Sequence, residues 1–187
     1  MFKNAMRLFY KKTTIWILAA GTAIMIFVMM LSGRPLNTPQ TPGGILCLEF
    51  ASTGQKVEDI LSAWKSNSIE QTDVIAAAKN NTYLDFIFLL FYSLLLCTCC
   101  LQLAASMPDK KTFSFVFNVI SLFALLAGLL DIFENVGMLK SLSGHISDQV
   151  AIATVTFAAI KWIVAIGVIL LIAGGAVYRR SVNSRKV

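Results

Sequence analysis

Apolar residues along this chain fall into four long runs separated by polar segments. Residues 13–33, 86–108 and 112–130 contain no charged side chain, and residues 149–178 contain one, Lys161. A helix needs about 20 apolar residues to cross the roughly 30 Å hydrocarbon core of a bilayer. The pattern predicts four transmembrane helices in one membrane domain covering residues 1–187, with spans at 13–33, 84–107, 112–133 and 150–177.

The composition indicates the same class of protein. Of the 187 residues, 57% are hydrophobic and only 14% are charged, whereas about a quarter of the residues in a soluble domain are charged. The chain is therefore expected to be an all-α integral membrane protein. Its first apolar run is longer than the apolar part of a signal peptide and has no clear cleavage site, so we expect it to be a retained anchor.

The net charge of +6 comes from cations that gather beside the predicted spans. Because Lys and Arg next to membrane helices mark the cytoplasmic side, both termini are expected to be cytoplasmic, in a plasma or inner membrane. This placement explains the basic charge without a nucleic acid partner. The cations that define it are Lys3, Arg7, Lys11, Lys12, Lys110, Lys111, Arg179, Arg180, Arg185 and Lys186.

The predicted outer loop, residues 34–82, contains a second kind of helical pattern. Four apolar residues in it recur at the spacing of one helix face, which predicts an amphipathic helix that lies on the outer membrane surface or caps the bundle. Residues 51–54 offer N-cap side chains for its start. A further helix is predicted to run from Ile69 directly into the second span. The apolar face consists of Val57, Ile60, Leu61 and Trp64.

Several polar residues lie where lipid or apolar protein is expected. A charge at the centre of a membrane helix costs about 2.5 to 3.5 kcal/mol on insertion scales, so such a residue usually has a partner or a function. Lys161 falls near the midplane of the fourth span, while Asp85 and Asp131 fall at the outer ends of the second and third. We predict that Lys161 converges with Asp85, Asp131 and Glu134, and that either Asp85 or Asp131 pairs with it.

One face of the third span is unusually polar. Asp131 and Asn135 are four residues apart and therefore neighbours on a helix. Toward the start of the span, Ser114, Asn118 and Ser121 fall within the same arc of roughly 140°, so this face is expected to look into the bundle. The candidate catalytic residues are Asp131, Glu134 and Asp85, and the candidate ligand-binding residues are Asn135, Lys161, Tyr92, Glu49 and Asn118.

Each candidate also has an ordinary structural interpretation. Asp85 suits the start of a helix, where the helix dipole favours an anion, and Glu134 suits a solvated second loop, residues 134–148. His145 also reads as a solvated loop residue. The cysteines Cys97, Cys99 and Cys100 lack the spacing of a zinc site and are expected to pack in the helix core. No metal site is predicted, and the pattern leaves a cofactor open.

Two functions remain compatible with the sequence. The first is the binding or modification of a lipid or lipid-linked molecule in an acid-lined polar site at the outer headgroup level, where neighbouring carboxylates can share the roles of proton donor and acceptor. The second is a structural role, in which the buried charges fix helix register and the outer loop docks a partner. Nucleotide-binding, zinc-protease and serine-hydrolase motifs are absent. Whether the protein is an enzyme or a homo-oligomer stays open.

Overall fold

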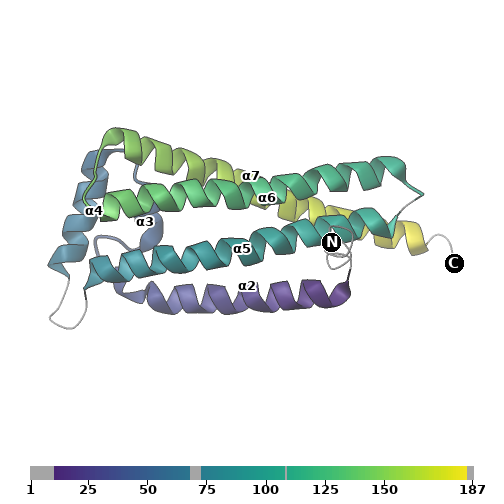
Figure 1. Ribbon diagram of the computed structural model, residues 1–187, viewed down its shortest axis with the longest axis horizontal. Helices are drawn as coiled ribbons and strands as arrows, with labels where there is room; N and C mark the ends of the chain where they lie inside the picture. The colour runs from purple at the N-terminus through teal and green to yellow at the C-terminus, as the bar shows by residue number, and fades with distance from the viewer. Residues whose placement is uncertain (1–10, 68–72, 108, 185–187) are drawn as a thin grey trace, which may run out of the picture. The chain divides into compact units, whose positions relative to one another are not determined.

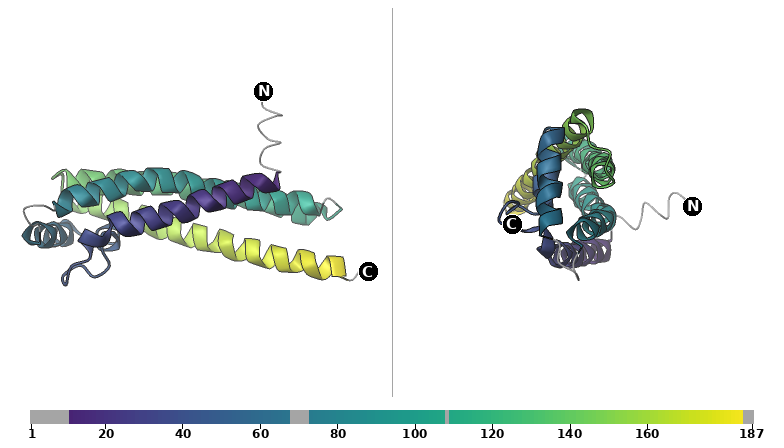
Figure 2. Two further views of the ribbon diagram at one scale, coloured as in Figure 1. Left: turned by 90° about the horizontal axis from the view of Figure 1, so that it is seen from below. Right: turned by 90° about the vertical axis from the view of Figure 1, so that its left-hand side faces the viewer.

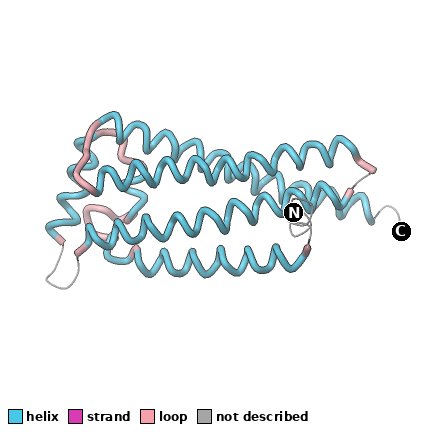
Figure 3. Tube along the Cα trace, viewed as in Figure 1, coloured by secondary structure: helices cyan, strands magenta, loops and turns pink. Residues whose placement is uncertain are grey.

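The computed structural model describes residues 11–67, 73–107 and 109–184, which form helices joined by short connections, with no strand in these ranges (Figure 3). Four of the helices are long and apolar enough to cross a membrane. They are α2 (Lys12–Ser32), α5 (Val74–Ser106), α6 (Lys111–Leu142) and α7 (Asp148–Ser184) (Figure 1). The shorter elements are η1 (Arg34–Leu36), α3 (Ile45–Glu49) and α4 (Gly54–Ser66).

Each predicted span falls on one of the long helices, but α5 and α6 extend well beyond the spans. Helix α5 is continuous from Val74, which agrees with the prediction of a helix leading into the second span; its predicted start at Ile69 lies outside the described residues. Helix α6 continues past the predicted span to Leu142. The prediction of a loop over residues 134–148 is therefore wrong, and the loop is confined to residues 143–147.

The end of α6 has a clear local cause. Gly144 has a φ of +90°, a conformation that side chains disfavour. Around it, the N–H of Gly144 donates to the carbonyl of Ser141, and the N–H of His145 donates to the carbonyl of Lys140. This pair of hydrogen bonds is the Schellman motif that closes many helices. No glycine in such a conformation occurs earlier in α6, and the apolar side chains of Met138 and Leu142 continue the buried face to its end.

The chain divides into two compact units, and the long helices each contribute to both. The described residues of Met1–Thr22, Leu90–Gly128 and Lys161–Val187 form unit 1, and Ala23–Leu89 with Leu129–Ile160 form unit 2. Each unit has its own hydrophobic core.

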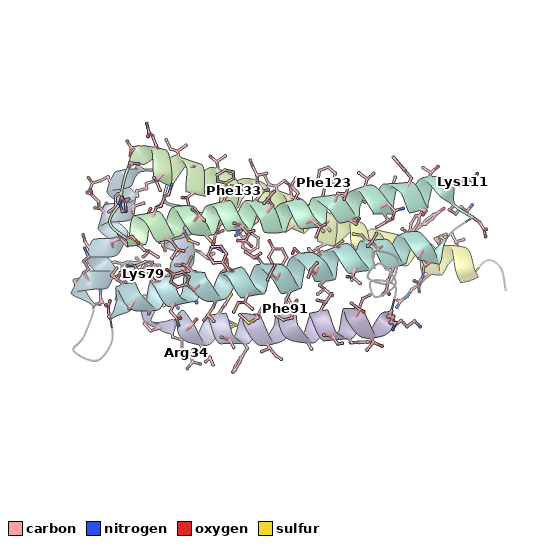
Figure 4. All side chains as sticks on the ribbon, in the orientation of Figure 1. Arg34, Lys79, Phe91, Lys111, Phe123 and Phe133 are labelled. Atoms are coloured by element: carbon pink, nitrogen blue, oxygen red, sulfur yellow. The ribbon has the colours of Figure 1, made fainter. Side chains whose placement is uncertain are left out.

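The core of unit 1 is built from α5, α6 and α7 around small side chains. It contains Ala124 of α6, which is fully buried, and Val168 of α7. Gly175 of α7 lies so close to the ring of Phe117 that a Cβ atom there would overlap it. Gly21 of α2 meets the ring of Phe91 in the same way; Phe91 is labelled in Figure 4. The α5 contribution is Cys97, Cys100, Leu103 and Ala104, which confirms the prediction that Cys97 and Cys100 pack in the core.

In unit 2, helix α4 covers the end where α5 begins, α6 ends and α7 begins (Figures 1 and 2). The hydroxyl of Thr53 caps α4 by accepting a hydrogen bond from the N–H of Lys56, as expected for the N-cap predicted within residues 51–54. The buried residues Val57, Leu61 and Trp64 then join one hydrophobic core with residues of η1, α3, α5, α6 and α7. The other buried members of this core include Leu36, Leu48, Val74, Ala78, Met138, Leu142 and Ala151.

Trp64 is the centre of this packing. Its side chain is fully buried, and its indole N–H lies 3.1 Å from the carbonyl oxygen of Leu36 and 2.9 Å from the hydroxyl of Thr41. Thr41 in turn donates to the same carbonyl and shares a hydrogen bond with Thr38. The segment between η1 and α3 is thus held against α4 by a buried polar network.

A second contact fixes the start of α4. The carboxylate of Asp148, the first residue of α7, accepts a hydrogen bond of 2.7 Å from the N–H of Gly54, the first residue of α4. The N-termini of α4 and α7 both lie at this carboxylate. The positive end of each helix dipole favours an anionic group there. A Cβ atom at Gly54 would lie 3.3 Å from the carboxylate of Asp148, closer than most Cβ contacts, so glycine favours this close approach.

Candidate functional site

Unit 2 contains a set of buried polar side chains from two long helices, here called the polar set: Asp85 of α5 and Asp131, Glu134 and Asn135 of α6. Asn135 is 0% exposed, Glu134 1% and Asp131 2%. Carboxylates are rarely buried to this degree unless they are paired or functional. The polar set is therefore the strongest candidate site in the described part of the chain.

The helical spacing of α6 explains why these residues are inside. The buried residues of α6 follow one stripe that includes Ala124, Ala127, Asp131 and Met138, the three- and four-residue spacing of a helix face. Asp131 lies about three turns before the end of α6 at Leu142. The helix dipole, which acts within the last turn, therefore has little effect on its charge.

One hydrogen bond joins the two helices at the polar set. The side-chain amide of Asn135 donates to a carboxylate oxygen of Asp85 over 2.8 Å, and both groups are buried. The oxygen of the same side-chain amide, Oδ1, has no hydrogen-bond partner among the described residues. Asp85, Asp131 and Glu134 each make further interactions in the structure. Asn135 thus offers one buried acceptor to a group from outside the described chain.

Further buried polar residues on α5 lie toward α2, and they were not among the predicted candidates. Asn81, four residues before Asp85, donates from its amide to the carbonyl of Met29 and to the hydroxyl of Ser32 on α2. Thr82 is also buried and donates to its own helix. Ala78, Asn81 and Asp85 are three and four residues apart, so they share one helix face. This spacing indicates a polar helix face, but residues 34–82 were predicted to form the outer loop.

Helices α6 and α7 approach closely beside the polar set. A Cβ atom on Gly137 would overlap the hydroxyl of Thr154, so only glycine fits at this point of α6. Thr154 is buried, and its hydroxyl donates to the carbonyl of Val150 one turn earlier in α7. A larger residue at position 137 would push α7 away from the turn of α6 that carries Glu134 and Asn135.

The remaining candidates have different positions. Glu49 lies at the end of α3 in unit 2 and is buried. Tyr92, Asn118 and Lys161 belong to unit 1. Lys161 is buried and lies 5.4 Å from the ring centroid of Trp162, a distance suited to a cation–π interaction. Its predicted pairing with Asp85 or Asp131 stays a prediction.

The prediction of an inward-facing position is wrong for Asn118, whose side chain is exposed. At 100° per residue, Asn118 lies about 120° around α6 from Ala124, the middle of the buried stripe. Ser121 and Asp131 belong to that stripe and are buried as expected. The predicted arc was therefore centred too far to one side because it followed polar residues alone.

The chemistry available to the polar set is hydrogen bonding and proton exchange. Across residues 11–67, 73–107 and 109–184, no three His, Cys, Asp or Glu side chains form a group that could hold a metal ion. Carboxylate and amide oxygens accept hydrogen bonds from hydroxyl and ammonium groups. Comparisons with protein families, with characterised proteins and with solved structures find no match to this chain.

Proposed function

We propose that this chain is an integral membrane protein that binds the headgroup of a lipid or lipid-linked molecule at the polar set of unit 2. The observation that carries the proposal is the burial of Asp131, Glu134 and Asn135 in a helix that is long and apolar enough to cross a membrane. Ionisable groups within membrane helices are rare and usually serve a ligand pathway or a binding site. The headgroup of a lipid would reach such a depth from the neighbouring bilayer.

The chemistry of the polar set favours a headgroup that donates hydrogen bonds. Three of its four members are carboxyl groups, and the free acceptor is the oxygen Oδ1 of Asn135. Ionised carboxylates donate nothing, so an unprotonated phosphate would be repelled. Hydroxyl or ammonium groups, as in a sugar or an amine headgroup, are donors that suit acceptors of this kind. Binding is the proposed activity, and the neighbouring carboxyls Asp131 and Glu134 would be the acid and base if turnover follows.

A binding experiment tests this proposal through Asp131. Wild-type protein and the near-isosteric variant Asp131→Asn are purified in the same mild detergent, and the retained lipids are identified by mass spectrometry. A hydrogen bond to a charged group contributes about 1.5 to 3 kcal/mol, so the variant is expected to bind its lipid about 10- to 100-fold more weakly. The matched control is Asp59→Asn, at an exposed acid of α4, which should retain the lipid.

Two results would count against the proposal. One is that the wild-type protein retains no lipid beyond the composition of the membrane from which it was extracted. The other is that Asp131→Asn and Asp59→Asn retain the same lipid in equal amount.

The alternative is a structural role for the same residues. It is favoured by the hydrogen bond between Asp85 and Asn135, which joins α5 to α6 with or without a ligand. Under this alternative, Asp131→Asn would lower stability without changing the retained lipid. A partner docking on α4 would belong to the same interpretation.

We also propose that both termini are cytoplasmic and that α4 lies on the opposite side of the membrane. In a Cys47→Ser background, cysteine is introduced at Lys56 of α4 or at Lys110 before α6, both of which are exposed positions. A membrane-impermeant maleimide should label Lys56→Cys on intact cells and Lys110→Cys only after permeabilisation. The reverse pattern would invert the proposed topology.

A further inference from the structure

One end of unit 1 concentrates positive charge. The cations lie at the start of α2, in the connection from α5 to α6 and at the end of α7, and all of them are exposed. A hydrogen bond from the amide of Gln102 to the carbonyl of Lys11 ties α2 to α5 at this end. Asp109 is the one acid among the described residues of unit 1. The described cations are Lys11, Lys12, Lys110, Lys111, Arg179 and Arg180; Lys3, Arg7, Arg185 and Lys186 lie outside the described residues.

A cavity of about 490 Å³ opens among these charges. It lies where α6 begins, at Lys111 (labelled in Figure 4), and Tyr178 of α7 also lines it. Its volume is in the range of small-molecule sites. Its lining includes Asp109, Lys110, Lys111, Thr112, Phe113 and Tyr178.

The polar wall of the cavity suits an anion. The N–H of Ser114 donates to the carbonyl of Lys110, which marks Lys110 as the residue before the first helical turn. The N–H groups of the three residues that follow have no acceptor within the helix. They point out of the helix end, where the positive end of the dipole attracts negative charge. With two lysine side chains and the hydroxyl of Thr112, these donors match the oxygens of a phosphate group.

The opposite wall of the cavity suits hydrocarbon. The rings of Phe113 and Tyr178 stack at a centroid distance of 5.6 Å, which fixes the end of α7 against the start of α6. Val116 lines the cavity next to this stack. Exposed apolar side chains, among them Phe115 and Val177, lie on the same two helices. A ligand that fits both walls therefore has an anionic head and an apolar tail.

We propose that this end of unit 1 binds the phosphate headgroup of an anionic phospholipid, with its acyl chains along α6 and α7. The cations alone would serve to orient the protein in the membrane, and orientation needs no cavity. The cavity, the helix start and the stacked rings give the site a shape, so binding is saturable and selective for the headgroup. Basic pockets between membrane helices bind anionic headgroups by the same chemistry.

The test uses the full-length protein in nanodiscs made of phosphatidylcholine with a small fraction of phosphatidylglycerol. Native mass spectrometry measures how many molecules of each lipid stay bound. Wild-type protein should retain phosphatidylglycerol well above its share of the nanodisc. Each lysine contributes a factor of about five to the attraction for anionic lipid at low ionic strength, so Lys110→Gln with Lys111→Gln should weaken retention about 25-fold.

The matched control is the pair Lys56→Gln and Lys65→Gln, which removes the same charge from exposed positions of α4 in unit 2. This control should retain phosphatidylglycerol as the wild type does, and Lys110→Arg with Lys111→Arg should restore retention. Equal losses in the α4 pair and the Lys110/Lys111 pair would show an effect of net charge alone and would overturn the proposal. No enrichment in the wild type would also overturn it.

A final arm identifies the source of the phosphate. Inorganic phosphate is added at constant ionic strength, with sulfate as the reference anion. A lipid site requires that phosphatidylglycerol remains bound at millimolar phosphate, because the apolar wall contributes to its affinity. Complete displacement by inorganic phosphate would indicate a site for the free ion and would contradict the lipid assignment.

Discussion

Replacing Trp64 with alanine is expected to lower the free energy of unfolding by about 3 to 5 kcal/mol. The indole is fully buried at the junction of α4 with the rest of unit 2, and its N–H is shared between the carbonyl of Leu36 and the hydroxyl of Thr41. Alanine would remove the packing, open a cavity and take the indole N–H out of this buried network. Chemical denaturation in detergent micelles, followed by circular dichroism, measures the loss.

Two further variants separate the causes of that loss. Trp64→Phe retains most of the apolar area but removes the N–H, so it should cost about 0.5 to 1.5 kcal/mol for the hydrogen bond. Trp16→Ala, at a side chain of α2 that is 74% exposed, should change the free energy by no more than about 0.5 kcal/mol. A cost for Trp64→Ala as small as that for Trp16→Ala would show that α4 is not packed on unit 2 in solution.

The helices of this protein could be predicted from the sequence because long apolar helices leave a strong pattern in it. Long uncharged runs identified α2, α5, α6 and α7, and the spacing of Val57, Leu61 and Trp64 identified the buried face of α4. These signals need only local residue order. The end of α6 was placed too early because Glu134 and Asn135 were taken as loop residues, whereas a polar residue does not end a helix when its side chain is buried inside.

The candidate site was predictable only in part. The four-residue spacing of Asp131 and Asn135 predicted that the two side chains share one face of α6. Both are buried in the structure. The partner of Asn135 was not predictable, because the rotation of α5 against α6 decides which residue lies opposite. The prediction left open whether Asp85 or Asp131 pairs with Lys161 and named no partner on α5 for Asn135, whose amide donates a hydrogen bond to Asp85 in the structure. The exposed position of Asn118 was missed for a different reason, because the predicted face followed polar residues alone and not the stripe centred on Ala124.

The hydrogen bond between Asp85 and Asn135 is expected to produce a strong energetic coupling. Asn135→Leu removes a donor from a buried carboxylate, at a cost of about 1.5 to 3 kcal/mol, and Asp85→Leu leaves a buried amide donor unsatisfied, at about 1 to 3 kcal/mol. Replacing both partners by apolar side chains of similar shape leaves neither a buried carboxylate nor a buried amide without its hydrogen-bond partner. The double variant should therefore be more stable than the sum of the single costs predicts, by about 1 to 3 kcal/mol.

Helix α4 supplies the control for this cycle. Gln55 donates to the carboxylate of Asp59 over 2.9 Å, so the pair has the same donor and acceptor types, but it is exposed. Its coupling should not exceed about 0.5 kcal/mol. Equal coupling in the two pairs would show that the bond between α5 and α6 is open to water and that burial does not strengthen it.

The same cycle separates the two proposed roles of the polar set when lipid retention is measured beside stability. If the set is structural, a double variant that regains stability also retains whatever lipid the wild type carries. If the set binds a headgroup, the double variant regains stability but loses the lipid, because two leucines repack the helices without supplying an acceptor. Hydrogen bonding to a ligand is the only contribution that an apolar pair of the same shape cannot replace.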